Sequence, residues 1–179
     1  MPSLTIGSEA PDFDLPGTDG QSHSLASYGD SPVLALVWSC NHCPYVQAYE
    51  DRLIALQRDL SARGVRLVAI NSNSAVTHPA DSFDRMAERA EAKGFNFDYL
   101  HDESQSVAHA HGAQRTPEVF VFDGDRRLRY HGGIDDSWDD PKAVTKTPLR
   151  DALDALLAGE EPSPTSTPAV GCTIKWHPA

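Results

Sequence analysis

The chain has 179 residues, of which 40% are hydrophobic and 8% aromatic, enough for one domain with a packed core. Its formal net charge of −11 argues against binding to nucleic acid or an anionic membrane, because both select for clustered Lys and Arg. No apolar run approaches the roughly 18 residues of a membrane-spanning helix, and residues 1–7 lack the basic start and apolar stretch of a signal peptide. We therefore expect a cytoplasmic protein.

The N-terminal region predicts a β-hairpin that extends the main domain. Residues 10–16 alternate apolar and polar side chains, as in a strand with one buried face. Asp19 and Gly20 are typical turn residues, and residues 22–25 are the expected returning strand.

A buried strand and a long helix follow. Residues 33–38, with the sequence VLALVW, form a continuous apolar run that is typical of a strand buried on both faces. Pro44 fits the first turn of a helix, where its missing N–H costs nothing. Apolar residues then recur every three or four positions over 46–60, which indicates a helix, and Gly64 is a suitable C-terminal cap.

The remainder of the domain alternates strands with helices. Further strands are predicted at 65–70, 97–100, 118–122 and 128–131, and further helices at 81–93, 105–111 and 147–157. The turn at 123–125 joins the last two strands as a hairpin, and an acidic loop occupies 132–146. This order predicts an α/β fold with a mixed central β-sheet flanked by helices, parallel in its early part and antiparallel in its late part.

The C-terminal segment differs in composition from the domain, which we expect to span residues 1–159. Residues 160–169 contain three prolines and indicate a stiff, extended linker. Residues 170–179 form a small apolar tail that carries Cys172.

The sequence Cys40-Asn41-His42-Cys43 lies between the first buried strand and the long helix. A helix N-terminus has unpaired N–H groups and a partial positive charge, which stabilise a reactive thiolate. The two-residue spacing lets the sulfurs close a disulfide, and His42 adds a hydrogen-bond donor or, when protonated, a positive charge. We expect a redox-active dithiol in which Cys40 is the exposed attacking sulfur and Cys43 resolves the mixed disulfide.

Two inert alternatives stay open for this cysteine pair. Cys40 and Cys43 have the spacing of a zinc knuckle, and His101, His109 and His111 are available as ligands. Zinc usually takes four ligands and the sequence has no second cysteine pair, so we expect no metal ion and no other cofactor. Two unreactive buried cysteines are equally disfavoured at a strand–helix junction. His109 and His111 are expected to be solvated.

The strand–Cys-x-x-Cys–helix unit, followed later by Thr116-Pro117 at the start of a strand, resembles the thioredoxin superfamily. The resemblance implies a thioredoxin-like fold in which Pro117 has a cis peptide bond, faces the cysteine pair, and follows backbone that binds the substrate as an added strand. Residues 7–15 resemble the opening of the alkyl hydroperoxide reductase/thiol-specific antioxidant branch, which is peroxiredoxin-like. The segments CNHCPYV, IDDS and GCTIKW further resemble a peroxiredoxin-like subgroup with a Cys-Asn-His-Cys motif.

The chain departs from both family patterns. With Cys43 placed as the peroxidatic cysteine of Pro-x-x-x-Thr/Ser-x-x-Cys, Cys40 falls on the Thr/Ser position and Leu36 on the proline position. Trp38 stands two residues before Cys40, not directly before it as in thioredoxin, and is either a core residue or a lid beside the sulfurs, more often the former. Arg115 stands where many relatives of the subgroup have a cysteine. It either favours a thiolate, binds an anionic substrate or is a plain surface cation.

Three functional hypotheses follow. The leading one is a thiol–disulfide oxidoreductase that exchanges with a protein or small-molecule disulfide and needs a thiol electron donor. The alternative is a thiol-dependent peroxidase, a peroxiredoxin-like antioxidant in which Cys43 is peroxidatic and Cys40 or Cys172 resolves the sulfenic acid. The extended linker is long enough for Cys172 to return to the cysteine pair. The third hypothesis is a non-enzymatic redox or metal-binding module.

Overall fold

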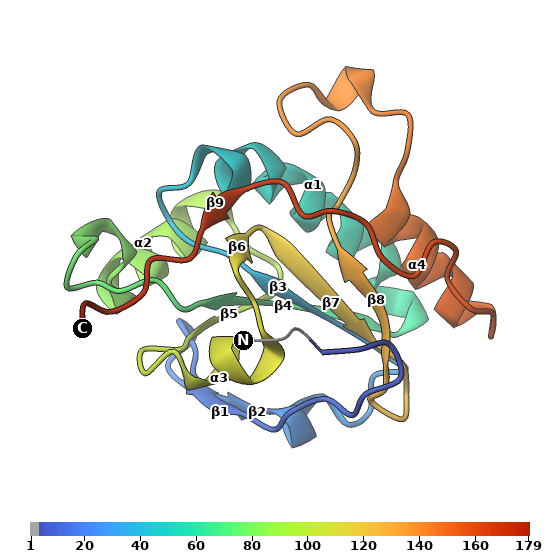
Figure 1. Ribbon diagram of the computed structural model, residues 1–179, viewed down its shortest axis with the longest axis horizontal. Coiled ribbons are helices and arrows are strands. Elements are labelled where there is room, and N and C mark those ends of the chain that lie inside the picture. Colours follow the sequence, from blue (N-terminus) through green and yellow to red (C-terminus); the bar gives the residue numbers. More distant parts are fainter. Residues whose placement is uncertain (1–3) are drawn as a thin grey trace.

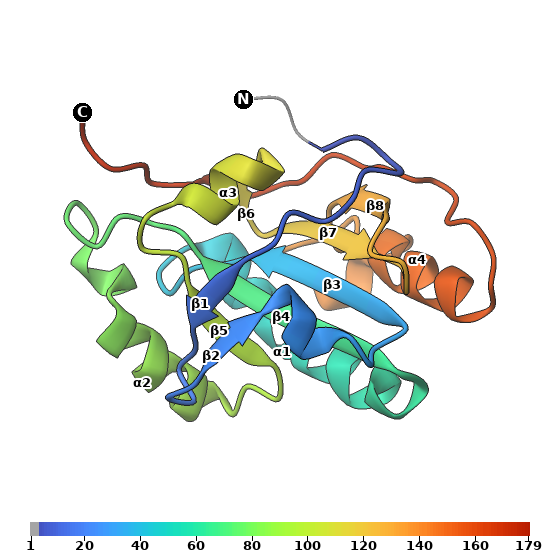
Figure 2. The ribbon, with the colours of Figure 1, turned by 90° about the horizontal axis from the view of Figure 1, so that it is seen from below.

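A five-stranded mixed β-sheet forms the centre of the computed structural model, which describes residues 4–179 (Figures 1 and 2). The strand order is β5–β4–β3–β7–β8, and the strands are β3 (Val33–Trp38), β4 (Val65–Asn71), β5 (Asp98–His101), β7 (Glu118–Phe122) and β8 (Leu128–Gly132). β3 pairs in parallel with β4, and β4 with β5, whereas β7 runs antiparallel to both β3 and β8. The predicted mixed sheet is confirmed.

Elements cover both faces of the sheet (Figure 1). One face carries α1 (Pro44–Leu60), α2 (Phe83–Lys93) and α4 (Pro148–Leu157), and the other carries α3 (Ser106–His111) with the hairpin β1 (Asp14–Pro16) and β2 (Ser22–Ser24). Because successive side chains of a strand point to opposite faces, Ala35 packs in the cluster under α1 and α4 while Leu36 packs in the cluster under the hairpin and α3. This two-sided burial explains the continuous apolar run of β3.

The predicted helices occur with small shifts at their starts. The helix expected over 81–93 begins at Phe83, because Ser82 is its N-cap and accepts a hydrogen bond from the backbone N–H of Arg85 at 3.3 Å. The helix expected over 105–111 begins at Ser106. Among the described residues, no helix combines the length and apolar character needed to cross a membrane.

The expectation that His111 is solvated is wrong. Its side chain is completely buried, and its ring lies 4.8 Å from that of Trp38 and 5.6 Å from that of Phe120. Burial lowers the pKa of His111 to about 4, so the ring is neutral at physiological pH. His109 on the same helix is exposed, as expected, and stacks on Trp176.

The C-terminal segment runs back across the molecule from the end of α4 (Figure 1). It first lies beside β8, where the backbone N–H of His131 donates to the carbonyl of Thr165 at 3.1 Å and that of Thr167 donates back to His131 at 3.1 Å. It then forms β9 (Cys172–Thr173), which pairs antiparallel with β6 (Arg115–Thr116). The tail is therefore part of the folded structure.

Candidate active site

The loop between β3 and α1 carries the two close cysteines and is fixed by Asn41. The backbone N–H of Asn41 donates to Asp81 Oδ1 at 2.7 Å, and its side-chain amide donates to the carbonyl of Ala80 at 2.9 Å. The hydroxyl of Tyr99 donates to Asn41 Oδ1 at 2.7 Å. These bonds tie the loop to the segment before α2 and to β5, so the positions of the sulfurs are set by distant parts of the chain.

Cys43, and not Cys40, stands at the N-terminus of α1. Pro44 is the first helical residue, as predicted, which makes Cys43 the N-cap. Cys40 lies three residues earlier and is turned inward, and both side chains are almost completely buried, at 2% and 1% exposure. The expectation that Cys40 is the exposed sulfur at the helix tip is therefore wrong.

Three sulfur atoms gather beside β6. Cys43 Sγ lies 2.8 Å from Cys172 Sγ and 3.5 Å from the carbonyl oxygen of Thr116. Cys40 Sγ lies 3.7 Å from Thr116 Oγ1, and no disulfide joins the three cysteines. The cluster brings together residues from the start of α1, from β6 and from the C-terminal tail.

The three thiols differ strongly in acidity. The pKa of Cys43 is lowered to about 4, mainly by its side-chain hydrogen bond with Cys40 and further by its contact with the thiol of Cys172 and by the backbone N–H of Val46. The pKa of Cys40 is raised well above its ordinary value by that same hydrogen bond to Cys43, by burial and by the charge of Asp81. Burial and the contact with Cys43 raise the pKa of Cys172 to about 11. Cys43 is thus the most acidic of the three thiols.

The segment that faces the sulfurs contains the expected cis peptide bond between Thr116 and Pro117. Glu118, which is 4% exposed, fixes this segment through hydrogen bonds. One of its carboxylate oxygens accepts the backbone N–H groups of Gln114 and Arg115, each at 2.9 Å, and the other pairs with His131 at 2.7 Å. The carbonyl and hydroxyl of Thr116 are therefore fixed in front of Cys43 and Cys40.

The tail approaches β6 closely because residue 171 has no side chain. A Cβ atom at Gly171 would lie 2.0 Å from the carbonyl oxygen of Thr116, which is sterically impossible. Arg115 is exposed and donates from Nη1 to the carbonyl of Gly171 at 3.0 Å. Arg115 therefore holds the tail in place instead of contacting the sulfurs.

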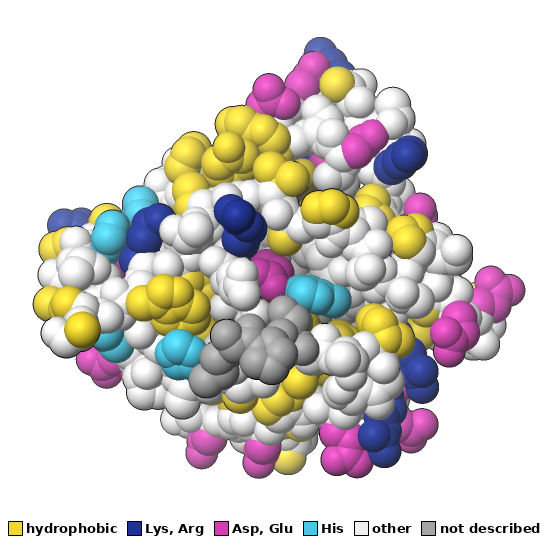
Figure 3. Space-filling view, viewed as in Figure 1, with side chains coloured by type: hydrophobic (Ala, Val, Ile, Leu, Met, Phe, Trp, Pro, Cys, Tyr) yellow, Lys and Arg dark blue, Asp and Glu magenta, His cyan; other side chains and the backbone are white. Residues whose placement is uncertain are grey.

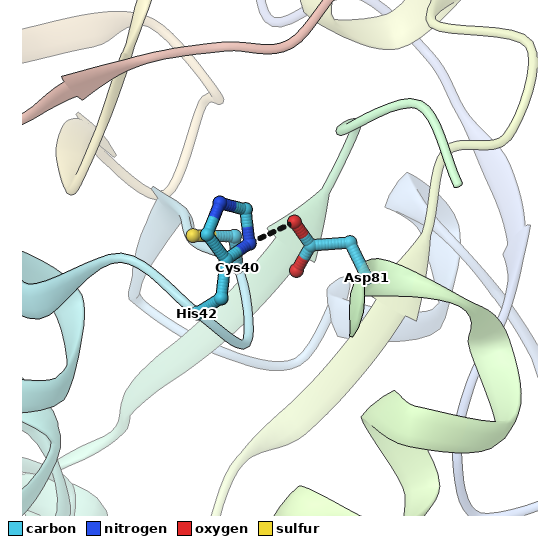
Figure 4. Close-up of side chains that lie close together, drawn as sticks. All are labelled: Cys40, His42 and Asp81. Atoms are coloured by element: carbon cyan, nitrogen blue, oxygen red, sulfur yellow. Dashed lines mark ion pairs between the residues drawn. The ribbon is translucent and has the colours of Figure 1, made fainter. Parts of the chain in front are cut away.

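His42 forms an ion pair with the completely buried Asp81 (Figure 4). Its ring also stacks on that of His78. Ligand atoms of Cys40, His42 and Asp81 lie within 4.8 Å of one another, so these three residues are the set nearest the sulfurs that could hold a metal ion. Zinc usually takes a fourth ligand. Both Asp81 oxygens already accept hydrogen bonds, Oδ1 from Asn41 and Oδ2 from Asn73. This hydrogen bonding favours a structural role for Asp81.

Of the remaining predicted residues, Trp38 belongs to the core. It is completely buried, packs edge-on against Phe120 and donates from Nε1 to Ser72 Oγ at 3.0 Å. Three residues of the site, Asp81, Glu118 and Gly171, were not predicted from the sequence. A signal existed only for Gly171, because it directly precedes the third cysteine.

Apolar side chains gather on the surface around the first turns of α1, on the face that also carries β9 (Figure 3). Tyr45 and Trp138 are both partly buried, and their ring centroids are 4.2 Å apart. Val170 in the tail is 52% exposed. The partly exposed Cys172 therefore has an apolar residue two positions earlier in the tail, and Tyr45 packs against the same sulfur cluster.

The fold and the sulfur cluster define a thioredoxin-like thiol protein. The chain belongs to the AhpC/TSA family, whose model matches residues 6–131. Together with the Cys40–Cys43 pair, this family identifies a thiol-based oxidoreductase.

Three similar proteins support the family and the fold. A curated relative, the thiol-disulfide oxidoreductase ResA of Geobacillus thermodenitrificans, is 27% identical over 129 residues, which cover 71% of this chain and 68% of that protein. A solved structure of a hypothetical protein from Sinorhizobium meliloti 1021 is 40% identical, with a TM-score of 0.92 and coverage of 99% and 98% of the two chains. An uncharacterized conserved protein from Geobacillus kaustophilus is 38% identical, with a TM-score of 0.91 and coverage of 100% and 98%.

Proposed function

We propose that the protein is a thiol–disulfide oxidoreductase in which Cys43 is the attacking sulfur and Cys40 resolves the mixed disulfide. The observation that carries this proposal is the position of Cys43 at the N-cap of α1, in one cluster with Cys40, together with its lowered pKa. The thiolate is the nucleophile in disulfide exchange, so the acidity of Cys43 selects it for the first step. This order reverses the one expected from the sequence.

The proposed reaction consists of two exchange steps. The Cys43 thiolate attacks one sulfur of a substrate disulfide, and the other substrate sulfur leaves as a thiolate that takes up a proton. Cys40 then loses its proton and attacks Cys43 Sγ, which releases the second substrate sulfur and leaves a Cys40–Cys43 disulfide. Two electrons pass from the protein to the substrate, and a thiol donor must return them before the next cycle.

The substrate is a disulfide-bonded protein or small molecule, in agreement with the name of the relative ResA, a thiol-disulfide oxidoreductase. The resemblance to the thioredoxin superfamily implies that a partner chain adds as a strand along Thr116. That position already holds the chain's own β9, with Thr116 in register with Cys172. A protein substrate therefore has to move β9 aside or react at its surface.

Reduction of insulin disulfides tests the proposal. Cys43→Ser is expected to abolish the activity, because it removes the most acidic thiol of the cluster, which stands at the N-cap of α1. The double variant Cys40→Ser/Cys172→Ser keeps the attacking sulfur and lacks both thiols that contact it, so mixed disulfides at Cys43 should accumulate in mass spectra. Full activity of Cys43→Ser, or mixed disulfides at Cys40, would refute the assignment.

A second candidate is a thiol peroxidase, and the burial of Cys43 favours it. At 1% exposure, Cys43 is reached more easily by a small peroxide than by a protein disulfide. The thiolate would attack one peroxide oxygen to give a sulfenic acid and release the other as water or an alcohol, and Cys40 or Cys172 would condense with the sulfenic acid and expel water. Mass spectrometry after one equivalent of peroxide separates the two functions. Fast oxidation at Cys43 with negligible insulin reduction would favour the peroxidase.

A further inference from the structure

The tail places Cys172 where a reaction partner of Cys43 belongs. β9 pairs with β6 in a register that puts Cys172 opposite Thr116, whose carbonyl oxygen also lies 3.5 Å from Cys43 Sγ. The two sulfurs are 2.8 Å apart, and a disulfide bond is about 2.05 Å long, so a shift of less than about 1 Å joins them.

The tail is anchored on both sides of Cys172, so this contact does not depend on a loosely held chain end. Upstream, the hydroxyl of Thr167 accepts the backbone N–H of Gly133 at 3.0 Å. Downstream, Ile174 is 3% exposed, and the backbone of Lys175 donates to Asn73 Oδ1 at 2.9 Å and accepts from the N–H of Ser74 at 2.7 Å. These contacts hold Cys172 in one position beside the thiolate.

Cys172 is also the accessible member of the sulfur cluster. Its side chain is partly exposed, whereas Cys40 and Cys43 are buried beneath it and beneath β6. A thiol from another molecule that approaches the cluster from solvent therefore meets Cys172 first.

We propose that Cys172 is a third redox cysteine, which forms a disulfide with Cys43 in the oxidised protein and is the sulfur at which a reducing dithiol enters. This inference rests on the proposed disulfide exchange. Starting from the Cys40–Cys43 disulfide, Cys172 loses its proton and attacks Cys43 Sγ. Cys40 leaves as a thiolate and takes up that proton, so the step involves no net oxidation.

Electrons then enter through Cys172. A thiolate of the external dithiol attacks Cys172 Sγ, and Cys43 leaves as the thiolate. The second thiolate of the dithiol attacks the first one's sulfur, which releases Cys172 and yields the oxidised partner. Attack at Cys172 is favoured because it is the exposed sulfur and because Cys43, the most acidic thiol, is the best leaving group.

Disulfide mapping tests whether the Cys43–Cys172 bond forms. The Cys40→Ser variant is treated with one equivalent of diamide, which takes two electrons from two thiols, and its peptides are analysed without reduction. We expect an intramolecular Cys43–Cys172 disulfide in most molecules, and the same bond as a minor form in the wild type. Thr173→Ser, a substitution in the strand that carries Cys172, is the matched control and should give the same disulfides as the wild type. Cys172 still free in oxidised Cys40→Ser would overturn the proposal.

The rate of reduction tests whether Cys172 is the entry point. Oxidised wild type and oxidised Cys172→Ser are mixed with dithiothreitol, and thiols are counted against time. We expect Cys172→Ser to be reduced about tenfold more slowly, because its remaining disulfide is buried. Equal rates would overturn this inference while leaving exchange at Cys40–Cys43 intact. Absence of insulin reduction by the wild type would refute the proposed function, whereas the mapping result would still stand.

Discussion

The acidity of Cys43 arises from its neighbours as much as from its helix. The strongest contribution is the hydrogen bond from Cys40, followed by the thiol of Cys172 and the backbone N–H of Val46 at the start of α1. The macrodipole of a 17-residue helix adds to this field. The geometry therefore links the pKa of one sulfur to the presence of the other two.

We predict that Cys43 titrates near pH 4. Thiolate absorbance at 240 nm is recorded against pH for the wild type and for Cys43→Ser, and the difference is assigned to Cys43. The signal should be full at neutral pH and disappear as the pH falls through about 4. Cys40→Ala removes the main donor and should move the midpoint upward, whereas Thr173→Ser should leave it in place. A wild-type midpoint close to 9, the ordinary thiol value, would contradict the assignment.

Asp81 is predicted to hold the cysteine loop in place. It is completely buried and accepts hydrogen bonds from the backbone of Asn41 and the side chain of Asn73. Asp81→Asn puts an amide donor where an acceptor is needed, so we expect the free energy of unfolding to fall by about 1–3 kcal/mol in urea titrations. Asp125→Asn, at an exposed turn, should change it by less than about 0.5 kcal/mol. Equal effects of the two substitutions would show that the buried carboxylate of Asp81 stabilises the fold no more than an exposed one.

At the scale of elements, the pairing of β6 with β9 depends on a close backbone contact. Gly171→Ala places a Cβ atom 2.0 Å from the carbonyl oxygen of Thr116, so the tail has to move away. We predict that this variant, made in the Cys40→Ser background, forms little Cys43–Cys172 disulfide with diamide. Gly124→Ala is the control, because its Cβ would have only an ordinary contact of 3.5 Å with Pro32. Undiminished disulfide in Gly171→Ala would mean that the pairing is not required.

The elements themselves were largely predictable because their patterns are local. The apolar run of β3 and the helical spacing of α1 depend on residues that are close in the sequence, and both elements occur where predicted. Pro44 at the first helical position also indicates that Cys43 is the N-cap. The burial of Cys40 was not predictable in this way, because Asp81 and Tyr99 fix the loop at Asn41 from distant positions.

At the scale of the whole molecule, the contact between Cys43 and Cys172 joins residues 129 positions apart. Composition indicated a stiff segment over 160–169 with enough reach to return, but no periodic pattern specifies where an extended tail docks. Its docking depends on single contacts such as the Lys175 backbone with Asn73 and the close approach at Gly171. The sequence therefore indicated that Cys172 could reach the cysteine pair, and only the folded structure shows that it contacts Cys43.

The C-terminal tail covers Cys43, so a chain that lacks residues 160–179 should expose the Cys43 thiol to solvent. A chain that ends at Gly159 keeps the five-stranded sheet and α1 to α4, so we expect it to fold. Loss of the buried Ile174 and the tail hydrogen bonds should lower the free energy of unfolding by about 2–4 kcal/mol.

The reactivity of Cys43 measures this uncovering directly. The reference is full-length Cys172→Ser, which lacks the same sulfur but keeps the cover, so any difference reports access and not the loss of a hydrogen-bond donor. At equal pH, the truncated chain should react with a bulky maleimide at Cys43 at least about tenfold faster, because labelling of a buried thiol needs the cover to open first. Peptide mapping locates the label on Cys43. Equal labelling rates would mean that β6 and the helix, and not the tail, keep the thiolate from solvent.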